Sequence, residues 1–305
     1  MPRKKMPMPN PSPSLQFPKP DRADAPYGQH RHQTLDLYLP AGSGPFPLVV
    51  FIHGGGWIDG DKVGRLRIDD VQQFRSRGCA VASINYRFAR DGSEAGLWPP
   101  VLAPLHDAKC AVQYLRFMAA EWNLDATKVA VYGGSAGAFS ALWLGLSPDF
   151  AEPAAQDPVA RMSTRVKAIG AINAQTSLDP RQMREWVGPA LCYGGHAFGL
   201  DGLTPAGFAQ FLARRDEFAE WYPRLSPASL LAAGAPPILL HYDLGLNDPR
   251  QDADYHTHSP KFGIGFQALA RTCGLTCHLR YQGSTDEGPA GVVEFMADHL
   301  HSAEG

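Results

Sequence analysis

Short apolar runs alternate with helical stretches along most of this chain, and this alternation limits the fold more than any other feature of the sequence. Apolar runs predict strands at 34–40, 46–56, 78–87, 128–134, 165–173, 236–243 and 277–283. Helical spacing predicts helices near 67–77, 102–122, 135–146, 260–272 and 290–301. Several of the strands are continuous apolar runs, which is typical of strands that are buried on both faces. The pattern therefore predicts an α/β fold with a central, mostly parallel sheet flanked by helices.

Two segments depart from this alternation. Residues 1–28 are basic and rich in proline, without the apolar stretch that an export signal needs, so we expect a disordered tail followed by one domain over 29–305. The segment 174–235 separates two predicted strands by about sixty residues and contains the amphipathic stretch "TPAGFAQFLARRDEFAEWY". We expect a helical cap over the strand ends there, with an ordinary surface insertion as the alternative.

Composition excludes several classes of function. The formal net charge of −2 gives no electrostatic reason to expect a nucleic-acid or membrane partner, and no run is long and apolar enough to span a bilayer. Five scattered cysteines indicate neither a disulfide framework nor a zinc signature, so we expect reduced thiols, no metal and a cytoplasmic location. The sequence leaves the oligomeric state open.

The stretch "VYGGSAGAF" (131–139) directly follows an apolar run and matches the pattern G-x-S-x-G. In that pattern a sharp strand-to-helix turn exposes the serine hydroxyl, and glycines on either side avoid a clash. Ser135 is therefore the candidate nucleophile, and the backbone N–H of Ala136 is a candidate oxyanion donor at the helix N-terminus. A tight turn without chemistry is the alternative.

A second glycine motif, "FIHGGGW" (51–57), follows another buried strand. Glycines there let the backbone approach a substrate and offer N–H groups to a developing negative charge, so Gly54 and Gly55 are candidate oxyanion donors. A phosphate-binding loop is the rival interpretation, but no G-K-[ST] follows. We expect His53 to stabilise the loop rather than to carry protons.

Together the stretches "HGGGWIDGDK" (53–62), "HDAKCAVQYLR" (106–116), "GGSAGA" (133–138) and "SPASLLAAGAPPILLHYD" (226–243) resemble the α/β-hydrolase superfamily. The chain is similar, from about 30 to 301, to the hormone-sensitive-lipase-like esterases and to the feruloyl or acetyl esterases with HGGGW. The resemblance implies hydrolysis of a small-molecule carboxylic ester through an acyl-enzyme at Ser135, without a metal or organic cofactor. An acetyl or aromatic ester of a carbohydrate is the substrate class it suggests.

The resemblance implies a catalytic triad of serine, acid and histidine, and its acid and histidine are harder to assign than the serine. In the family the acid follows the strand corresponding to "PPILLHYD", but the loop after it is about ten residues longer here. Four carboxylates compete for the role, with Asp254 aligning best and Asp248 second: Asp243, Asp248, Asp252 and Asp254.

The family histidine follows the last strand, where this chain has "YQGSTDEGPAG" (281–291) with Asp286 or Glu287 at the expected position. A carboxylate is a poor base towards serine because its usual pKa is far below that of imidazole. His258 is our first substitute, four residues after Asp254, with His256 and His196 as further candidates. Two hypotheses remain: an esterase with a relocated histidine, or a degenerate hydrolase that binds a ligand without turnover.

Overall fold

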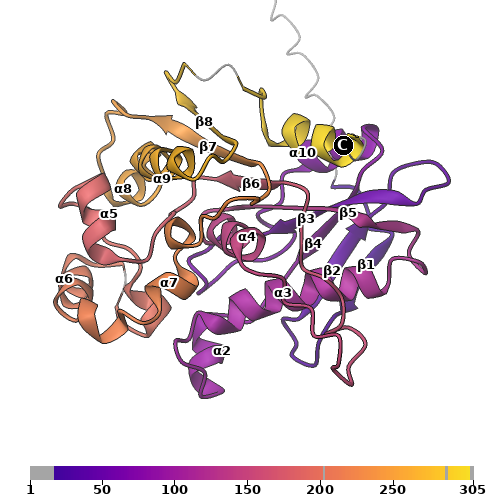
Figure 1. Cartoon of the computed structure of the whole chain (residues 1–305), viewed down its shortest axis with the longest axis horizontal. Helices are drawn as coiled ribbons and strands as arrows, with labels where there is room; N and C mark the ends of the chain where they lie inside the picture. The colour runs from indigo at the N-terminus through magenta and orange to yellow at the C-terminus, as the bar shows by residue number, and fades with distance from the viewer. Residues whose placement is uncertain (1–16, 202, 286–287, 303–305) are drawn as a thin grey trace, which may run out of the picture.

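The computed structural model describes residues 17–201, 203–285 and 288–302, and within them eight strands form one sheet in the order β1-β2-β4-β3-β5-β6-β7-β8 (Figure 1). The strands are β1 Arg22–Pro26, β2 Thr34–Tyr38, β3 Phe46–Ile52, β4 Ala80–Ile84, β5 Leu124–Gly134, β6 Ile169–Ile172, β7 Ile238–Gly245 and β8 Cys277–Gln282. β2 pairs antiparallel with β1 and β4, and the remaining neighbours are parallel. The predicted α/β fold with a mostly parallel sheet is confirmed.

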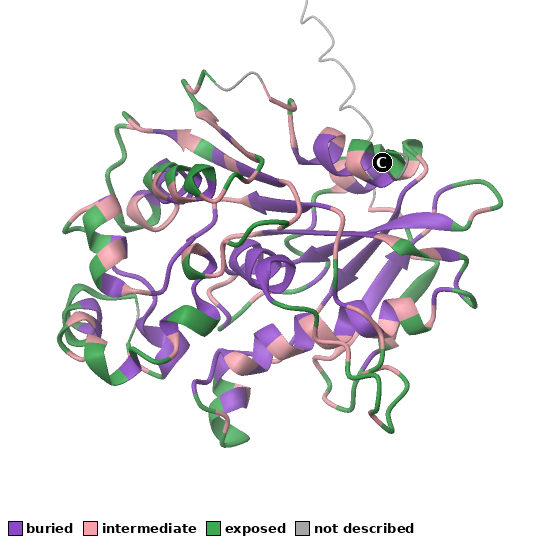
Figure 2. Ribbon diagram, viewed as in Figure 1, coloured by how far each residue is buried: buried purple, intermediate pink, exposed green. Residues whose placement is uncertain are grey.

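Helices cover both faces of the sheet, as Figure 1 shows. One face carries α1 Ile68–Ser76 and α10 Val292–His301; the other carries α3 Leu102–Phe117, α4 Ala136–Leu146 and α9 Pro260–Thr272. Two short helices, α2 Ala89–Glu94 and α8 Ala253–Thr257, follow β4 and β7. Figure 2 shows the buried residues concentrated in the central strands and in α4, which is buried along its whole length. This burial explains why the central strands are continuous apolar runs.

The expectation that residues 1–28 form one disordered tail is wrong for part of that range. Residues 1–16 lie outside the described part of the chain, but β1 pairs with β2 along the edge of the sheet. The Asp24 amide donates to Asp36 Oδ1 (2.8 Å), and Lys62 Nζ lies 2.8 Å from Asp24 Oδ1 and 3.2 Å from Asp36 Oδ1. Polar partners thus hold this edge strand, whose sequence "RADAP" has no apolar pattern and ends in a proline that an edge tolerates.

The 174–235 segment, which links β6 to β7, is rich in short helices. They are α5 Pro180–Val187, η1 Gly195–Phe198, α6 Pro205–Ala213, η2 Arg215–Phe218, α7 Tyr222–Leu225 and η3 Pro227–Ser229. Aromatic side chains hold them together: Phe198 stacks on Phe218 with ring centroids 4.7 Å apart, and Phe211 and Tyr222 pack around this pair. These aromatic contacts continue the core that lies on the α3 and α4 side of the sheet.

The parallel strands bring several loops to one edge of the sheet. β3, β5 and β6 end level with one another, because Ile52 pairs with Gly133 and Gly134 with Ile172, and β7 passes this level at His241 and continues to Gly245. Loops that follow the carboxyl ends of neighbouring parallel strands lie side by side. The glycine loop after β3, the serine after β5 and the long loop after β7 therefore meet there.

Among the described residues no helix combines the length and the apolar character required to cross a bilayer. All five cysteines are free thiols.

Candidate active site

Ser135 lies at a strained turn between β5 and α4. Its backbone angles are φ 52° and ψ −121°, a conformation that L residues rarely adopt and that is typical of a serine exposed on such a turn. The Ser135 amide donates to the Ile172 carbonyl on β6 (2.8 Å), which holds the turn against the sheet. Glycine is required at 137, since a Cβ atom there would overlap the carbonyl oxygen of Ile52.

His258 and Asp254 complete a chain of hydrogen bonds with this serine. Ser135 Oγ and His258 Nε2 are 2.9 Å apart, and His258 Nδ1 and Asp254 Oδ1 are also 2.9 Å apart. Asp254 belongs to α8 and His258 follows the last residue of that helix, so the two side chains share a face at i and i+4. The first substitute histidine and the best-aligned acid thus meet the serine. The Asp254 side chain is 67% exposed, far more than a buried triad carboxylate.

The other three candidate acids have different partners. Asp243 exchanges hydrogen bonds with Asn173 (2.7 and 3.0 Å), and the neighbouring His241 imidazole lowers the pKa of Asp243 to about 2. Asp248 pairs with Arg250. Asp252 caps the N-terminus of α8 by accepting from the backbone amide of the third helical residue (2.8 Å).

The other candidate bases lie elsewhere. Both ring nitrogens of His196 are buried without a hydrogen-bond partner among the described residues, and the ring packs against Trp57 and Tyr193. Burial lowers the pKa of His196 to about 4, so its imidazole is neutral. His256 Nδ1 is likewise buried and unpartnered in the described part of the chain, and the ring packs edge-on against its neighbour Tyr255. Asp286 and Glu287 lie outside the described residues.

The glycine loop after β3 approaches the serine closely. A Cβ atom on Gly54 would lie 2.7 Å from Gly134 O and 3.2 Å from Ser135 Cβ, so only glycine fits. Gly55 has a φ of 116°, which favours glycine as well. Ala136 is the first residue of α4, where backbone N–H groups have no partner within the helix and the helix dipole adds positive potential. Of the predicted oxyanion donors, Gly54 and Ala136 thus adjoin Ser135, and Gly55 follows Gly54 in the same loop.

Two aromatic residues hold the glycine loop in place. The fully buried Trp57 donates from Nε1 to Ser140 Oγ (3.1 Å), and that hydroxyl donates to the Ala136 carbonyl (2.9 Å), which ties the loop to the start of α4. Tyr86 donates to the His53 carbonyl (2.7 Å) and its ring stacks on the His53 imidazole. Burial lowers the pKa of His53 to about 4, so it is neutral, as expected for a loop-stabilising residue.

A pocket of about 690 Å³ opens beside Ser135. Its lining includes Gly54, Gly55, Asp254 and His258, and from the 174–235 segment Cys192, Tyr193 and Leu203. Asp243, one of the four candidate acids, also lines it, and sequence reasoning missed five further charged or polar side chains of the lining: Asp59, Arg65, Arg67, Asp70 and Asn173. The available signal was the position of Asp59 and Arg65 after the glycine motif and of Asn173 at the end of a predicted strand, at the edge where parallel strands end.

Comparisons with known proteins agree with this architecture. The model of the BD-FAE family matches residues 35–243. A probable isoprenylcysteine alpha-carbonyl methylesterase from Arabidopsis thaliana is 32% identical over 143 residues, which are 47% of this chain and 28% of that protein. The matched region thus spans little more than a quarter of this curated relative's length.

Solved structures share the fold at low sequence identity. Thermogutta terrifontis esterase 2, phosphonylated by sarin, has a TM-score of 0.62 and 22% identity, with 93% of this chain and 92% of that chain covered. An acetyl ester-xyloside bifunctional hydrolase from Caldicellulosiruptor lactoaceticus has a TM-score of 0.60 and 21% identity, with 81% and 76% covered. Since the family model covers more than half of the chain, the chain belongs to the BD-FAE family of esterase-like α/β-hydrolases.

Proposed function

We propose that this chain is a serine carboxylesterase that hydrolyses small carboxylic esters through an acyl-enzyme. The observation that carries the proposal is the 2.9 Å contact between Ser135 Oγ and His258 Nε2, continued by the 2.9 Å contact between His258 Nδ1 and Asp254. A serine hydroxyl becomes an effective nucleophile when an adjacent base can accept its proton. The geometry therefore supports the relocated histidine over its absence.

In this mechanism Ser135 Oγ attacks the ester carbonyl while His258 Nε2 takes the hydroxyl proton. The N–H groups of Gly54, Gly55 and Ala136 stabilise the oxyanion that forms. His258 returns the proton to the leaving alcohol, and the acyl group remains on Ser135. A water molecule then gives a proton to His258 and attacks the acyl-enzyme, which releases the carboxylic acid and restores the serine. Asp254 keeps the imidazole in the required tautomer and stabilises its charged form.

The lining of the pocket favours an ester whose alcohol part is polar. Arg65, Arg67 and Asp243 line it together with backbone glycines, and such side chains bind hydroxyl groups by hydrogen bonds. The Caldicellulosiruptor protein is named as an acetyl ester hydrolase; we extend that activity to this chain and propose an acetyl or aromatic ester of a carbohydrate as substrate. We further propose that the 174–235 segment acts as a cap, since three of its residues line the pocket.

Labelling with a fluorophosphonate probe tests the activation of the serine. We expect rapid labelling of the wild type, none of Ser135→Ala, and labelling slowed by at least about 10²-fold in His258→Gln. His256→Gln is the matched control, because it makes the same change two residues away without touching the serine. An unlabelled, folded wild type would support the ligand-binding hypothesis instead.

Turnover of p-nitrophenyl acetate, acetylated xylo-oligosaccharides and methyl ferulate then separates the substrate classes. Activity on the first compound alone would leave the esterase proposal standing and refute the carbohydrate proposal.

A further inference from the structure

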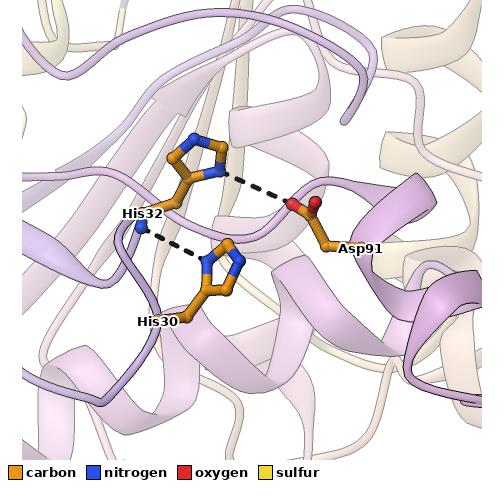
Figure 3. A group of neighbouring side chains, drawn as sticks. All are labelled: His30, His32 and Asp91. Atoms are coloured by element: carbon orange, nitrogen blue, oxygen red, sulfur yellow. Dashed lines mark hydrogen bonds and ion pairs between the residues drawn. The ribbon is translucent and has the colours of Figure 1, made fainter.

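Two histidines and a carboxylate lie together near the surface (Figure 3), and none of the three belongs to the ester site. His30 and His32 belong to the turn between β1 and β2, and Asp91 is the third residue of α2. Each residue offers one ligand atom, and these three atoms all lie within 4.8 Å of one another. Figure 3 shows the His32 ring facing the Asp91 carboxylate and the His30 ring beside them, with His30 Nδ1 accepting from the His32 backbone amide (3.3 Å).

The spacing of these atoms suits a transition-metal ion. His32 Nδ1 is 3.5 Å from Asp91 Oδ2. Two ligands bound to zinc at about 2.0–2.1 Å in tetrahedral geometry lie about 3.3–3.4 Å apart. The pair is therefore already close to ligand spacing, and the His30 ligand atom lies within 4.8 Å of both atoms of the pair.

Hydrogen bonds hold both sides of the cluster without a metal. The Gln33 amide donates to the His30 carbonyl (2.8 Å) and the His30 amide to Gln33 Oε1 (2.9 Å), so the turn is closed on itself. Gln33 Nε2 donates to the buried Asp107 (2.7 Å), which anchors the turn on α3. On the opposite side the Phe88 amide donates to Asp91 Oδ2 (2.7 Å) and fixes the carboxylate. Ligands fixed in this way lose little entropy when a metal binds.

An ordinary histidine–carboxylate ion pair is the competing explanation, because the 3.5 Å separation of His32 Nδ1 and Asp91 Oδ2 fits one, and the zinc titration described below decides between the two. His32 Nδ1 is shielded from solvent yet makes no hydrogen bond with any described residue, although a carboxylate oxygen lies 3.5 Å away. A buried polar atom without a partner is costly, so such atoms usually have one. The His32 ring also packs on Phe88, with centroids 5.0 Å apart, which restricts its rotation.

Access to the cluster is open. His30, Asp91 and Glu94 line a surface hollow of about 560 Å³, from which water or the Glu94 carboxylate can supply a fourth ligand. Arg90 Nε lies 3.9 Å from Asp91 Oδ1, the other carboxylate oxygen, and Arg87, which also lines the hollow, pairs with Asp107. None of the residues that line this hollow lines the pocket at Ser135.

We propose that His30, His32 and Asp91 form a binding site for one borderline divalent transition-metal ion, with Zn²⁺ as the best fit. Two imidazoles and one carboxylate are ligands that zinc prefers, whereas Mg²⁺ prefers oxygen ligands alone. A metal bound here would clamp the β1–β2 turn to α2. That helix in turn donates from the Ala89 amide to the Trp57 carbonyl (2.8 Å) at the end of the glycine loop. The site is structural and separate from the ester chemistry.

The test uses the full-length, untagged protein, first dialysed against a chelator. Isothermal titration with Zn²⁺, and metal analysis after dialysis against Zn²⁺, are expected to give one ion per chain. Zn²⁺ is expected to raise the melting temperature because it binds only the folded state, and Mg²⁺ is not. The variants His32→Gln and Asp91→Asn are each expected to weaken zinc binding by at least about tenfold. His299→Gln, which changes a histidine outside the cluster, is the matched control and is expected to bind like the wild type.

Circular dichroism checks that each variant is folded; because His32→Gln and Asp91→Asn act from opposite sides of the cluster, either folded variant suffices. Equal zinc affinity in the wild type and in a folded cluster variant would overturn the proposal. So would equal stabilisation by Mg²⁺ and Zn²⁺, which would indicate diffuse binding to surface carboxylates. Ester hydrolysis is not the readout, so failure of either proposal leaves the other intact.

Discussion

The exposure of Asp254 leads to a quantitative prediction for the variant Asp254→Asn. In buried serine triads the corresponding change lowers kcat by about 10⁴-fold, since the amide imposes the wrong imidazole tautomer. Here the Asp254 side chain is 67% exposed, and the only hydrogen-bond partner of its carboxylate in the described part of the chain is His258. An exposed asparagine can rotate to present its oxygen to His258 Nδ1, so the tautomer survives.

What remains is the loss of charge stabilisation. A carboxylate and an imidazolium about 4 Å apart attract by about 1 kcal/mol in water and about 4 kcal/mol at an effective dielectric constant of 20. The exposure of Asp254 places this pair towards the aqueous limit, at about 1–2 kcal/mol. That free energy corresponds to a fall in kcat of about 5- to 30-fold.

The assay is the hydrolysis of p-nitrophenyl acetate under saturating conditions. Asp248→Asn is the matched control: it makes the same change in the same loop, where the carboxylate pairs with Arg250, and it is expected to leave kcat unchanged. A fall of less than twofold in Asp254→Asn would show that another group orients His258. A fall beyond about 10³-fold would refute the argument from exposure, because it would require a rigidly held acid.

Three further predictions concern the surrounding framework. Gly137→Ala is expected to destabilise the fold by about 1–3 kcal/mol in urea unfolding, since a methyl group would overlap the Ile52 carbonyl; Gly134→Ala, where a Cβ atom meets nothing within 4 Å, should be nearly neutral. Trp57→Phe removes the 3.1 Å hydrogen bond to the α4 hydroxyl and is expected to cost about 1 kcal/mol in thermal unfolding and to lower kcat more than it changes KM; an unchanged kcat would contradict the positioning role. Burial lowers the pKa of His196 from 6.5 to about 4, so the unfolded chain binds a proton more tightly than the folded chain. The stability that is present above pH 6.5 is therefore lost as the pH falls towards 4. This histidine accounts for about 2 kcal/mol of that loss between pH 7 and pH 5, and His196→Phe, unfolded in urea at both pH values, should reduce the pH dependence by that amount.

The strands and both glycine turns follow from local sequence. Strands buried on both faces need continuous apolar residues, so apolar runs in the sequence predict β3, β4, β5 and β7. The glycine motif around Ser135 is recognisable in the sequence because the strained turn leaves no room for a side chain at 137. These features depend on a residue and its immediate neighbours along the chain.

β1 was missed for the opposite reason. It lies at the edge of the sheet, where no apolar pattern is required, and the distant Lys62 pairs with its Asp24 (2.8 Å). The metal cluster is similar: His30 and His32 are close in sequence, but Asp91 comes from a helix beyond β2, β3 and β4. Only the packing of α2 against the β1–β2 turn brings the third ligand near.

The candidate site likewise has one part that local sequence predicts and another that only the tertiary structure decides. The spacing of four residues between Asp254 and His258 was visible in the sequence, because any helical turn places such residues on one face. The sequence could not decide among four carboxylates and several histidines, since the contact with Ser135 joins residues 123 positions apart. That contact exists because β5 and β7 end at the same edge of a parallel sheet, with β6 between them. Local sequence thus determined which turns and helices form, while the order of strands in the sheet decided which side chains meet.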